Sequence, residues 1–472
     1  MARKTVKRVK TGSLERRFSL ARAGFLAGAR YATASAGNLF GSADQREQRR
    51  RHNLSERANE LVDEIGQLKG SVVKIGQMMA LFGEHFLPPE VTAALHTLEN
   101  DTTALEWPAV QKHLRQQLGT LKLNELEVDP EPLGAASLGQ VHRARRKSDG
   151  AELVLKIQYP GVADAIDSDM RALVQLLKLS RLVPITEQFN QWLDEVREML
   201  GREVDYDLEA HTTRHFKKAL ADDPRFIVPE VYDDYSTHSI LCLSYEAGVR
   251  ISDPAVSGLS QQRRNFLGRA IMELCCREVF EWDKMQTDPN FGNYLMRVDG
   301  DGEDRIVLLD FGAIRDFDDE ILAPGREMIR ASWYHDTDRL VRAMRSLGFL
   351  TGDVPRRLLD DFAALCFEAI EALQDPDRFP PPDSVINDKG EYLWGESDLP
   401  NRIMNRASRT ALSVYFAVPP KEFIFLFRKL LGAYTFLHVI KAEVRGDTIL
   451  RPFVAMREQQ DREIVARRIA RR

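Results

Sequence analysis

Three short segments that follow one another along the chain constrain its fold more than any other feature. The first is Gly134-Ala135-Ala136-Ser137-Leu138-Gly139-Gln140-Val141, the second Asp288-Pro289-Asn290-Phe291-Gly292-Asn293 and the third Asp310-Phe311-Gly312. They match a glycine-rich loop in which Ala136 replaces the middle glycine, a D-x-x-x-x-N loop and a D-F-G triplet, which are patterns of phosphoryl transfer. One match alone is a weak signal, whereas three in this order predict a nucleotide phosphotransfer site.

Such a site needs backbone amides over the phosphates, a fixed cation, ligands for a divalent metal and a carboxylate near the acceptor. The first segment can supply the amides, because glycine lets a backbone approach phosphate closely. Its candidate nucleotide-binding residues are Gly134, Ala135, Ala136, Ser137 and Gly139. An ordinary tight turn is the alternative reading of this stretch taken alone.

The candidate cation is Lys156. Residues 141–158, with a turn at Ser148-Asp149-Gly150, are predicted to form a β-hairpin, and Lys156 lies on its second strand. Apolar neighbours on both sides favour a buried strand and a phosphate-binding lysine over a solvent-facing lysine on an edge strand. A second buried strand is predicted at 239–245, and Tyr245 at its end is a further candidate for nucleotide contact.

A lysine in this role needs a carboxylate from a neighbouring helix. We choose Glu209, on a helix predicted to extend over 186–218, as the partner that orients Lys156. Glu203 and Asp205 are expected to face a different side of that helix. A solvated acidic helix face is the alternative interpretation of these three carboxylates.

The second and third segments carry the candidate base and metal ligands. Asp288 could deprotonate an acceptor hydroxyl, and Asn293 and Asp310 could hold Mg²⁺, which uses few protein ligands when it is bound to ATP phosphates. Asp310 follows a hairpin predicted over 294–309, which would bring its carboxylate to a sheet edge. Gln286-Thr287 replaces the usual His-Arg before the aspartate. Simple turns are the alternative for both segments.

Upstream of these motifs, residues 54–82 have the apolar period of a helix. Lys74 and Gln77 are three residues apart and therefore share one face of it. Gly70 and Gly76 would each cost about 1 kcal/mol relative to alanine within a helix, so we expect a close neighbour on that face.

The charge of the chain is unevenly distributed. Residues 1–51 hold thirteen Lys/Arg and three Asp/Glu, a net charge of +10, so the remainder carries −15 of the total of −5. This asymmetry predicts an anionic partner. We favour a phospholipid surface, because no nucleic-acid-binding module is found; a solvated basic tail is the alternative. The first forty residues contain arginine and serine and few acidic residues, as a mitochondrial transit peptide also does.

No apolar run is long enough to predict a transmembrane helix. The four cysteines show no metal-binding or C-x-x-C spacing, which predicts free thiols in a reducing compartment.

At these residues the chain resembles the UbiB family of atypical kinases, also called the aarF-domain-containing or ADCK proteins, over roughly residues 60–445. The second segment, read from Gln286 to Asn293, is most similar to the ubiquinone-biosynthesis branch. The other matching motifs are the K-x-G-Q helix at Lys74–Gln77, the alanine-rich loop at Gly134–Ser137, the E-x-D motif at Glu203–Asp205 and the lysine-pairing Glu209.

The resemblance implies an α+β, two-lobed, protein-kinase-like fold with an N-terminal helical extension. It implies that the K-x-G-Q helix covers the active site and blocks protein substrates, with Lys74 contacting Glu203 or Asp205. The implied activity is ATP- and Mg²⁺-dependent, either ATP hydrolysis or phosphorylation of a small molecule, in support of lipid-quinone synthesis at a membrane. Gly134, where many relatives have alanine, could weaken the suppression of ordinary kinase chemistry.

We therefore expect a basic segment at 1–52, a helical extension at 53–127, an N-lobe at 128–248 and a C-lobe at 249–472. Expected partners are ATP, a lipid or quinone precursor, a membrane surface contacted peripherally and a complex of biosynthetic enzymes, but no nucleic acid. The expected location is cytoplasmic at a membrane, or mitochondrial in a eukaryote. The alternatives are a nucleotide-binding scaffold without turnover and a true protein kinase.

Overall fold

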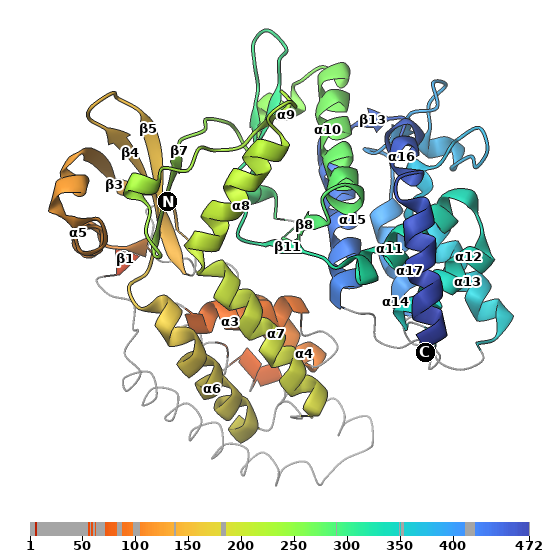
Figure 1. Cartoon of the computed structure of the whole chain (residues 1–472), viewed down its shortest axis with the longest axis horizontal. Helices are drawn as coiled ribbons and strands as arrows, with labels where there is room; N and C mark the ends of the chain where they lie inside the picture. The colour runs from red at the N-terminus through yellow and green to blue at the C-terminus, as the bar shows by residue number, and fades with distance from the viewer. Residues whose placement is uncertain are drawn as a thin grey trace. The chain divides into compact units, whose positions relative to one another are not determined.

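The computed structural model describes the chain with several gaps (Figure 1). The described residues are 5–6, 55–56, 58–59, 62, 71–82, 87–97, 104–135, 138–180, 186–288, 290–348, 350, 354–410 and 421–471. Nearly all of the basic segment 1–52, and with it the predicted membrane contact, lies outside them. So do Gly70 and the loop residues Ala136 and Ser137.

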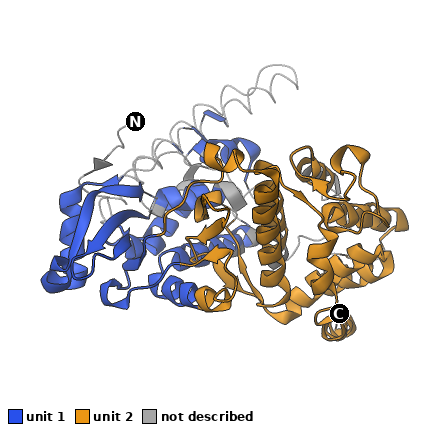
Figure 2. Ribbon diagram, turned by 90° about the horizontal axis from the view of Figure 1, so that it is seen from above, with its two compact units in different colours: residues 1–214, 229–245 blue, residues 215–228, 246–472 orange. Residues whose placement is uncertain are grey.

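The chain divides into two units that are interleaved in sequence (Figure 2). Unit 1 consists of Met1–Arg214 and Pro229–Tyr245, and unit 2 consists of His215–Val228 and Glu246–Arg472. The third and last switch between the units falls directly after Tyr245, where the candidate nucleotide-binding strand ends. The division into four segments expected from the sequence stays a prediction.

Unit 1 contains a four-stranded antiparallel sheet in the order β3-β4-β5-β7. The predicted hairpin is present as β4 and β5, and the predicted strand at 239–245 is β7. Along β5, Leu153, Leu155 and Ile157 are buried on one face, so Lys156 lies on the other. The strands are β3 (Leu126–Ala135), β4 (Gly139–Arg146), β5 (Glu152–Gln158) and β7 (Ile240–Ser244).

The outer strand β3 is not predicted by the sequence pattern. Pro130 and Pro132 lie within it, and the register with β4 shifts at Pro132 and again at Gly134. Proline cannot donate a hydrogen bond to a ladder, so it is tolerated on an edge strand with irregular pairing but hides the usual alternation. A short parallel pair, β1 (Thr5–Val6) with β2 (Ala104–Leu105), also belongs to this unit.

Helices make up the rest of unit 1, and α3, α6 and α7 pack against one another (Figure 1). In α3, Val72, Ile75 and Met79 are buried, as the apolar period of 54–82 predicts. Gly76 is also buried, consistent with a close neighbour on that face. The helices are α3 (Ser71–Phe82), α4 (Pro89–His96), α5 (Trp107–Asn124), α6 (Val162–Ser180), α7 (Glu187–Glu203) and α8 (Tyr206–Ala219), of which α8 continues into unit 2 from His215.

The single helix expected over 186–218 is wrong, because it is interrupted between α7 and α8. Val204 ends α7 with φ −100° and ψ 3°. Asp205 then caps α8, since its Oδ1 accepts a hydrogen bond of 2.8 Å from the Leu208 N–H. Glu203 and Glu209 are therefore on different helices rather than on different faces of one helix.

Unit 2 is mainly helical and contains the second predicted hairpin. β9 (Tyr294–Arg297) and β10 (Arg305–Leu308) pair antiparallel, and β6 (Phe226–Ile227) pairs parallel with β10. β8 (Lys284–Gln286) pairs antiparallel with β11 (Ile314–Asp316), so the residues just before Asp288 lie beside those just after Asp310-Phe-Gly. Two short strands, β12 (Tyr392–Leu393) and β13 (Glu443–Val444), complete the pairing.

The long helices of unit 2 pack side by side (Figure 1). α11 and α17 are joined by buried ion pairs, in which Asp461 accepts hydrogen bonds from Arg326 and Arg330. The helices are α9 (Pro254–Ser257), α10 (Gln261–Phe280), α11 (Asp319–Tyr334), α12 (Thr337–Leu347), α13 (Arg356–Ala369), α14 (Leu399–Thr410), α15 (Lys421–Val439), α16 (Asp447–Val454) and α17 (Glu458–Arg471).

Two further expectations from the sequence can be compared with the structure. The four cysteines are free, and three of them are buried. Within the part of the chain that the structure describes, no helix has both the length and the apolar character needed to cross a bilayer.

Candidate active site

The glycine-containing turn joins β3 to β4 in unit 1. Gly134 pairs with Val141 and Ala135 with Gln140 across the described sides of the turn. A Cβ on Gly139 would lie 2.5 Å from the Ile157 carbonyl oxygen, so only glycine fits there, whereas a Cβ on Gly134 would meet none of the described residues within 4 Å. Gly139 is therefore required by the neighbouring strand, whereas the described residues leave space beside Gly134.

Lys156 and Glu209 form the ion pair that the sequence led us to expect. Lys156 Nζ lies 2.6 Å from Glu209 Oε1, and the Glu209 side chain is only 2% exposed. Lys156 pairs with Val141 on one side and Leu241 on the other, so β5 is an interior strand rather than an edge strand. This arrangement orients a partly exposed ammonium group on a rigid sheet. Its role with phosphate remains a prediction.

The start of α8 holds this pair in place. Tyr206 packs with Val231, Leu241 and other apolar residues in a small core between α8 and β7. The Lys156 ammonium also lies over the Tyr206 ring, 5.6 Å from its centroid. Helix and sheet are therefore joined by apolar contact as well as by charge, which keeps Glu209 at the lysine.

Lys74 of the K-x-G-Q helix makes the second ion pair of unit 1. Its Nζ lies 2.6 Å from Glu203 Oε1, and the two side chains are 24% and 33% exposed. Of the two E-x-D carboxylates, Glu203 thus contacts Lys74, whereas Asp205 caps α8. Gln77 lies partly exposed on the same helix.

Tyr245 stands at the end of β7. Its N–H donates to the Glu152 carbonyl at 3.0 Å, and the Arg143 guanidinium lies 4.3 Å from its ring centroid. The ring is thus held beside the hairpin that carries Lys156. Its contact with a nucleotide stays a prediction.

In unit 2, Asp288 and Asn293 are brought together by the turn between them. Asn293 Nδ2 donates to Asp288 Oδ2 at 3.0 Å, and the Asn290 N–H donates to Asp288 Oδ1 at 3.2 Å. The Gly292 N–H in turn donates to Asn290 Oδ1 at 2.9 Å, which tightens the turn. The amide and the carboxylate predicted from the D-x-x-x-x-N spacing are therefore adjacent.

Asp310 lies on a neighbouring segment that is tied to this turn. The Leu309 N–H donates to the Asn293 carbonyl at 2.9 Å, and Asp310 Oδ1 accepts from the Gly312 N–H at 2.9 Å. Phe311 is buried and packs against Phe216, with ring centroids 5.4 Å apart. Asp288, Asn293 and Asp310 thus belong to one connected part of unit 2.

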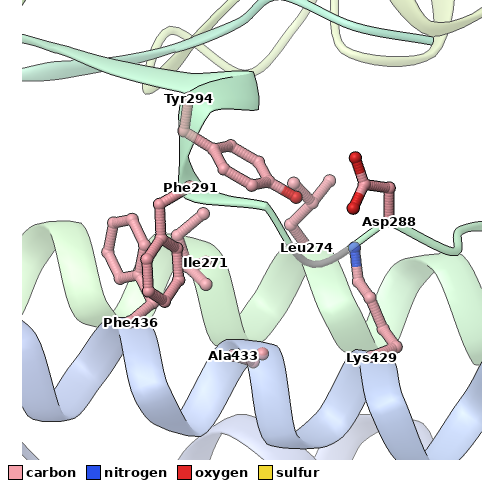
Figure 3. A pocket seen from close by; sticks show the side chains of 9 residues that line it. Ile271, Leu274, Asp288, Phe291, Tyr294, Lys429, Ala433 and Phe436 are labelled. Carbon is pink, nitrogen blue, oxygen red and sulfur yellow. The ribbon is translucent and has the colours of Figure 1, made fainter. Parts of the chain in front are cut away.

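A small cavity lies beside Asp288 (Figure 3). Figure 3 shows the Lys429 ammonium and the Tyr294 hydroxyl pointing toward the Asp288 carboxylate. The cavity has a volume of about 20 Å³, which is enough for one water molecule but not for an acceptor molecule. The other lining residues are Ile271, Leu274, Phe291, Gly432, Ala433 and Phe436.

Lys429 and Glu278 form a buried ion pair at this cavity. Lys429 Nζ lies 2.8 Å from both carboxylate oxygens of Glu278, and the two side chains are 9% and 2% exposed. Burial raises the pKa of the Glu278 carboxyl, and the nearby Lys429 ammonium opposes that rise. Burial also raises the pKa of the Tyr294 hydroxyl, so this tyrosine stays protonated.

Across the described residues, His, Cys, Asp and Glu do not gather in groups of three that could hold a metal ion alone. Asn293 and Asp310 offer an amide and a carboxylate, which are oxygen donors of the kind Mg²⁺ prefers. Because Asn293 donates its nitrogen to Asp288, its carbonyl oxygen is the end that can face a cation. The donor set fits Mg²⁺ bound jointly by protein and phosphate.

Sequence reasoning missed three residues that hold this region together. Gln286, noted only as a departure from the usual histidine, hydrogen-bonds to both the Asp288 segment and the Asp310 segment. Glu278 and Lys429 have no local signature, because they are 151 residues apart. The position of Gln286 in the motif was the only available signal.

These features define a protein-kinase-like phosphotransferase, and comparison with known proteins agrees. The model of the ABC1 atypical kinase-like domain matches residues 97–344, more than half of the chain. The solved structure of Rv3197 in complex with erythromycin, from Mycobacterium tuberculosis, is similar with a TM-score of 0.55 and 23% identity, covering 88% of this chain and 100% of that chain. That likeness supports the two-lobed α+β kinase-like fold.

Curated relatives agree over most of the chain. The mitochondrial atypical kinase COQ8B of Rattus norvegicus is 33% identical over 378 residues, which cover 80% of this chain and 68% of the relative. The mitochondrial atypical kinase COQ8 of Schizosaccharomyces pombe is 31% identical over 394 residues, covering 83% and 62% respectively. This chain belongs to the ABC1 atypical kinase-like family, as its resemblance to the UbiB proteins predicts, and it is an enzyme of the kinase and ATPase class.

Proposed function

We propose that this protein is an ATP- and Mg²⁺-dependent atypical kinase or ATPase that supports the synthesis of ubiquinone or another isoprenoid lipid at a membrane surface. The observation that carries the ATP assignment is the Lys156–Glu209 ion pair of 2.6 Å on an interior strand of an ABC1-family chain. The lipid pathway rests on the resemblance to the ubiquinone branch and on COQ8 relatives. The net charge of +10 in residues 1–51 supports peripheral contact with an anionic membrane.

In this proposal unit 1 binds phosphate. Lys156 contacts the phosphates, Glu209 orients Lys156, and Tyr245 contacts the nucleotide. The turn of Gly134, Ala135, Ala136, Ser137 and Gly139 contributes backbone amides. The space that the described residues leave at Gly134, where a Cβ would meet none of them within 4 Å, supports a close approach of a ligand to that backbone.

Unit 2 supplies the base and the metal ligands. Asn293 and Asp310 would hold Mg²⁺, which neutralises charge on the phosphates when it is bound. Asp288 accepts the proton of the acceptor hydroxyl or of water. The Asn293 amide and the Asn290 N–H hold the Asp288 carboxylate in one orientation, which limits the reorganisation needed during the reaction.

We further propose that α3 excludes protein substrates. Its support is the Lys74–Glu203 ion pair and the burial of Val72, Ile75 and Met79, which together hold α3 against α6 and α7. A small molecule or water is then the acceptor. In a eukaryotic source the expected location is mitochondrial, as the mitochondrial relatives support. In any other source, the proposed location is the cytoplasmic surface of a membrane.

The test is steady-state release of phosphate from MgATP, with and without anionic liposomes. We expect liposomes to stimulate the intact chain and Asp288→Asn to lower turnover by about 10²- to 10⁴-fold, the usual contribution of a general base. Asp301→Asn is the matched control, because Asp301 is an exposed carboxylate in the turn of the β9–β10 hairpin.

Loss of turnover in Asp288→Asn, but not in Asp301→Asn, supports the assignment of the base. Nucleotide binding without turnover by the intact chain, in any condition, would instead favour a nucleotide-binding scaffold for biosynthetic enzymes. Efficient phosphate transfer to added proteins would contradict the exclusion by α3.

A further inference from the structure

The side chain of Gln286 connects the segment of Asp288 to the segment of Asp310. Its Nε2 donates to the Asp310 carbonyl oxygen at 2.8 Å, and its Oε1 accepts from the Asp288 N–H at 3.1 Å. The two partners fix the orientation of the amide, since a backbone carbonyl only accepts and an N–H only donates. Both ends of one buried amide are therefore used, one on each segment.

The backbone of Gln286 is held as firmly as its side chain. Its N–H donates to Glu278 Oε2 at 3.0 Å, and Glu278 is paired with Lys429 of α15. Gln286 also pairs with Ile314 in the β8–β11 ladder. Because the Glu278 and Lys429 side chains are almost fully buried, solvent screens their interaction weakly. Gln286 is thus positioned from α10, α15 and β11 at once.

Other hydrogen bonds also join these segments. Thr287 donates to the Ala313 carbonyl through its N–H at 3.2 Å and its Oγ1 at 2.7 Å. Those bonds lie beyond Asp310 and do not reach the backbone of either aspartate. The Gln286 side chain, by contrast, contacts the Asp288 N–H and the Asp310 carbonyl oxygen, so it acts directly on the two candidate residues.

We propose that Gln286 is a positioning residue that sets the spacing between Asp288 and Asp310, with the Glu278–Lys429 pair holding its backbone in place. The proposal rests on the function proposed above for the two aspartates. Gln286 itself touches neither substrate nor metal in this role, and it acts through the backbone of its two partners.

The choice of glutamine has a physical consequence. Its amide is neutral and donates and accepts at every pH, so the connection does not titrate. A neutral histidine could also donate with one ring nitrogen and accept with the other. A protonated histidine can only donate, so it would lose the bond from the Asp288 N–H below its pKa, ordinarily near 6.5.

The experiment compares kcat and KM for MgATP in the full chain and three variants across about pH 6 to 8. Gln286→Leu removes both hydrogen bonds at similar volume, and Gln286→His keeps them only while neutral. The matched control is Gln374→Leu, because Gln374 is also buried in unit 2 and donates to the Ser332 carbonyl at 3.1 Å.

We expect Gln286→Leu to lower kcat/KM by about 10- to 100-fold, since small misplacements of catalytic groups have effects of this size. Gln374→Leu should stay within about threefold of the wild type once the folded fraction is measured. The activity of Gln286→His relative to wild type should fall toward acid pH, because protonation of the introduced imidazole removes its acceptor; burial holds the pKa of that imidazole below its ordinary value. A merely structural role would not produce that pH dependence.

The proposal is overturned if Gln286→Leu behaves like Gln374→Leu. If the wild type shows no turnover, the function proposed above fails, and a second readout still tests the positioning role. Hydrogen–deuterium exchange is then measured on peptides covering 284–294 and 309–316. Faster exchange of both in Gln286→Leu supports the connection, whereas a change in one peptide or neither contradicts it.

Discussion

Units 1 and 2 hold their candidate site residues in different ways. In unit 1, Lys156 and Lys74 each face a carboxylate at 2.6 Å, so charged side chains orient one another. In unit 2, neutral N–H groups orient the carboxylates. Asp288 accepts from the Asn293 amide and the Asn290 N–H, and Asp310 accepts from the Gly312 N–H.

This difference matches the charges that the two units are proposed to bind. An ammonium paired with a carboxylate keeps its donors aligned but contributes little net charge. An N–H donor orients a carboxylate without neutralising its negative charge. Loss of one charge should therefore harm nucleotide binding more in unit 2 than in unit 1.

The largest expected effect is that of Asp310→Asn. The amide oxygen can still accept from the Gly312 N–H, so the turn persists, but the negative charge for Mg²⁺ is gone. At about 100 times its Kd, MgATP should stabilise the wild type by about 2.7 kcal/mol. We expect this stabilisation to vanish in the variant and turnover to fall by roughly 10²- to 10³-fold, as when one electrostatic contact to a transition state is removed. Thermal unfolding and phosphate release measure the two effects.

Asp316→Asn is the control for this variant, because Asp316 lies on β11 just beyond Asp310 and pairs with Lys284 in an exposed position. It should keep the MgATP stabilisation. An equal stabilisation by MgATP in wild type and Asp310→Asn would break the comparison, because charge in unit 2 would then not be what binds the nucleotide.

Much of both sites was predictable because the signals are local. The turn at Ser148-Asp149-Gly150 and the apolar neighbours of Lys156 located its hairpin, and the D-x-x-x-x-N spacing placed Asn293 beside Asp288. The Lys156–Glu209 pair could be chosen in advance because a buried lysine strand needs a carboxylate from a nearby helix. In these cases a short stretch of sequence is enough to predict which residues lie together.

The rest depends on contacts without a local pattern. The break between α7 and α8 follows from the N-terminal cap that Asp205 forms on α8. Because Asp205 lies among other acidic residues, the sequence alone does not distinguish it as a capping residue. Two prolines hide the edge strand β3. Lys429 reaches Glu278 across 151 residues, so only the tertiary structure shows what holds Gln286.

An intermediate effect is expected from Glu209→Gln, which breaks the more buried of the two ion pairs described in unit 1. Glu209 is 2% exposed, so its change to a neutral amide removes a charged hydrogen-bond acceptor from a low-dielectric site. We expect a loss of about 2 kcal/mol of stability and a roughly tenfold loss of kcat/KM for MgATP. Urea unfolding and ATP turnover measure these two changes.

The matched variant is Glu203→Gln, which breaks the more exposed pair with Lys74. An ion pair whose side chains are 24% and 33% exposed contributes less than about 1 kcal/mol, because water screens it. The variant should therefore lower stability by less than Glu209→Gln does. Equal losses in the two variants would show that burial does not separate the two ion pairs of unit 1.

The smallest expected effect concerns acid and His142, which lies on β4 two residues from Gln140 in unit 1. Its ring is fully buried. Nδ1 lies 2.7 Å from the Asp129 carbonyl, to which it donates, and Nε2 accepts from Gln140 Nε2 at 2.7 Å. Burial lowers the pKa of this imidazole, while the Asp129 carbonyl and the charges of Asp129 and Glu131 oppose that shift. Protonation of His142 Nε2 would also place its N–H opposite the Gln140 Nε2–H, so two hydrogen-bond donors would face each other.

Since the folded-state pKa of His142 lies below the ordinary value near 6.5, the unfolded chain takes up the proton first as the pH falls. The stabilising contribution is complete above about pH 6.5 and is lost as the pH drops toward the folded-state pKa. His142→Gln keeps one donor and one acceptor without titrating, so its free energy of unfolding should decrease less between pH 7.5 and 5.5. Urea unfolding at both pH values tests this. Parallel losses in the two proteins would assign the acid sensitivity to other groups, such as His113 in unit 1 or His335 in unit 2, whose pKa values burial also lowers.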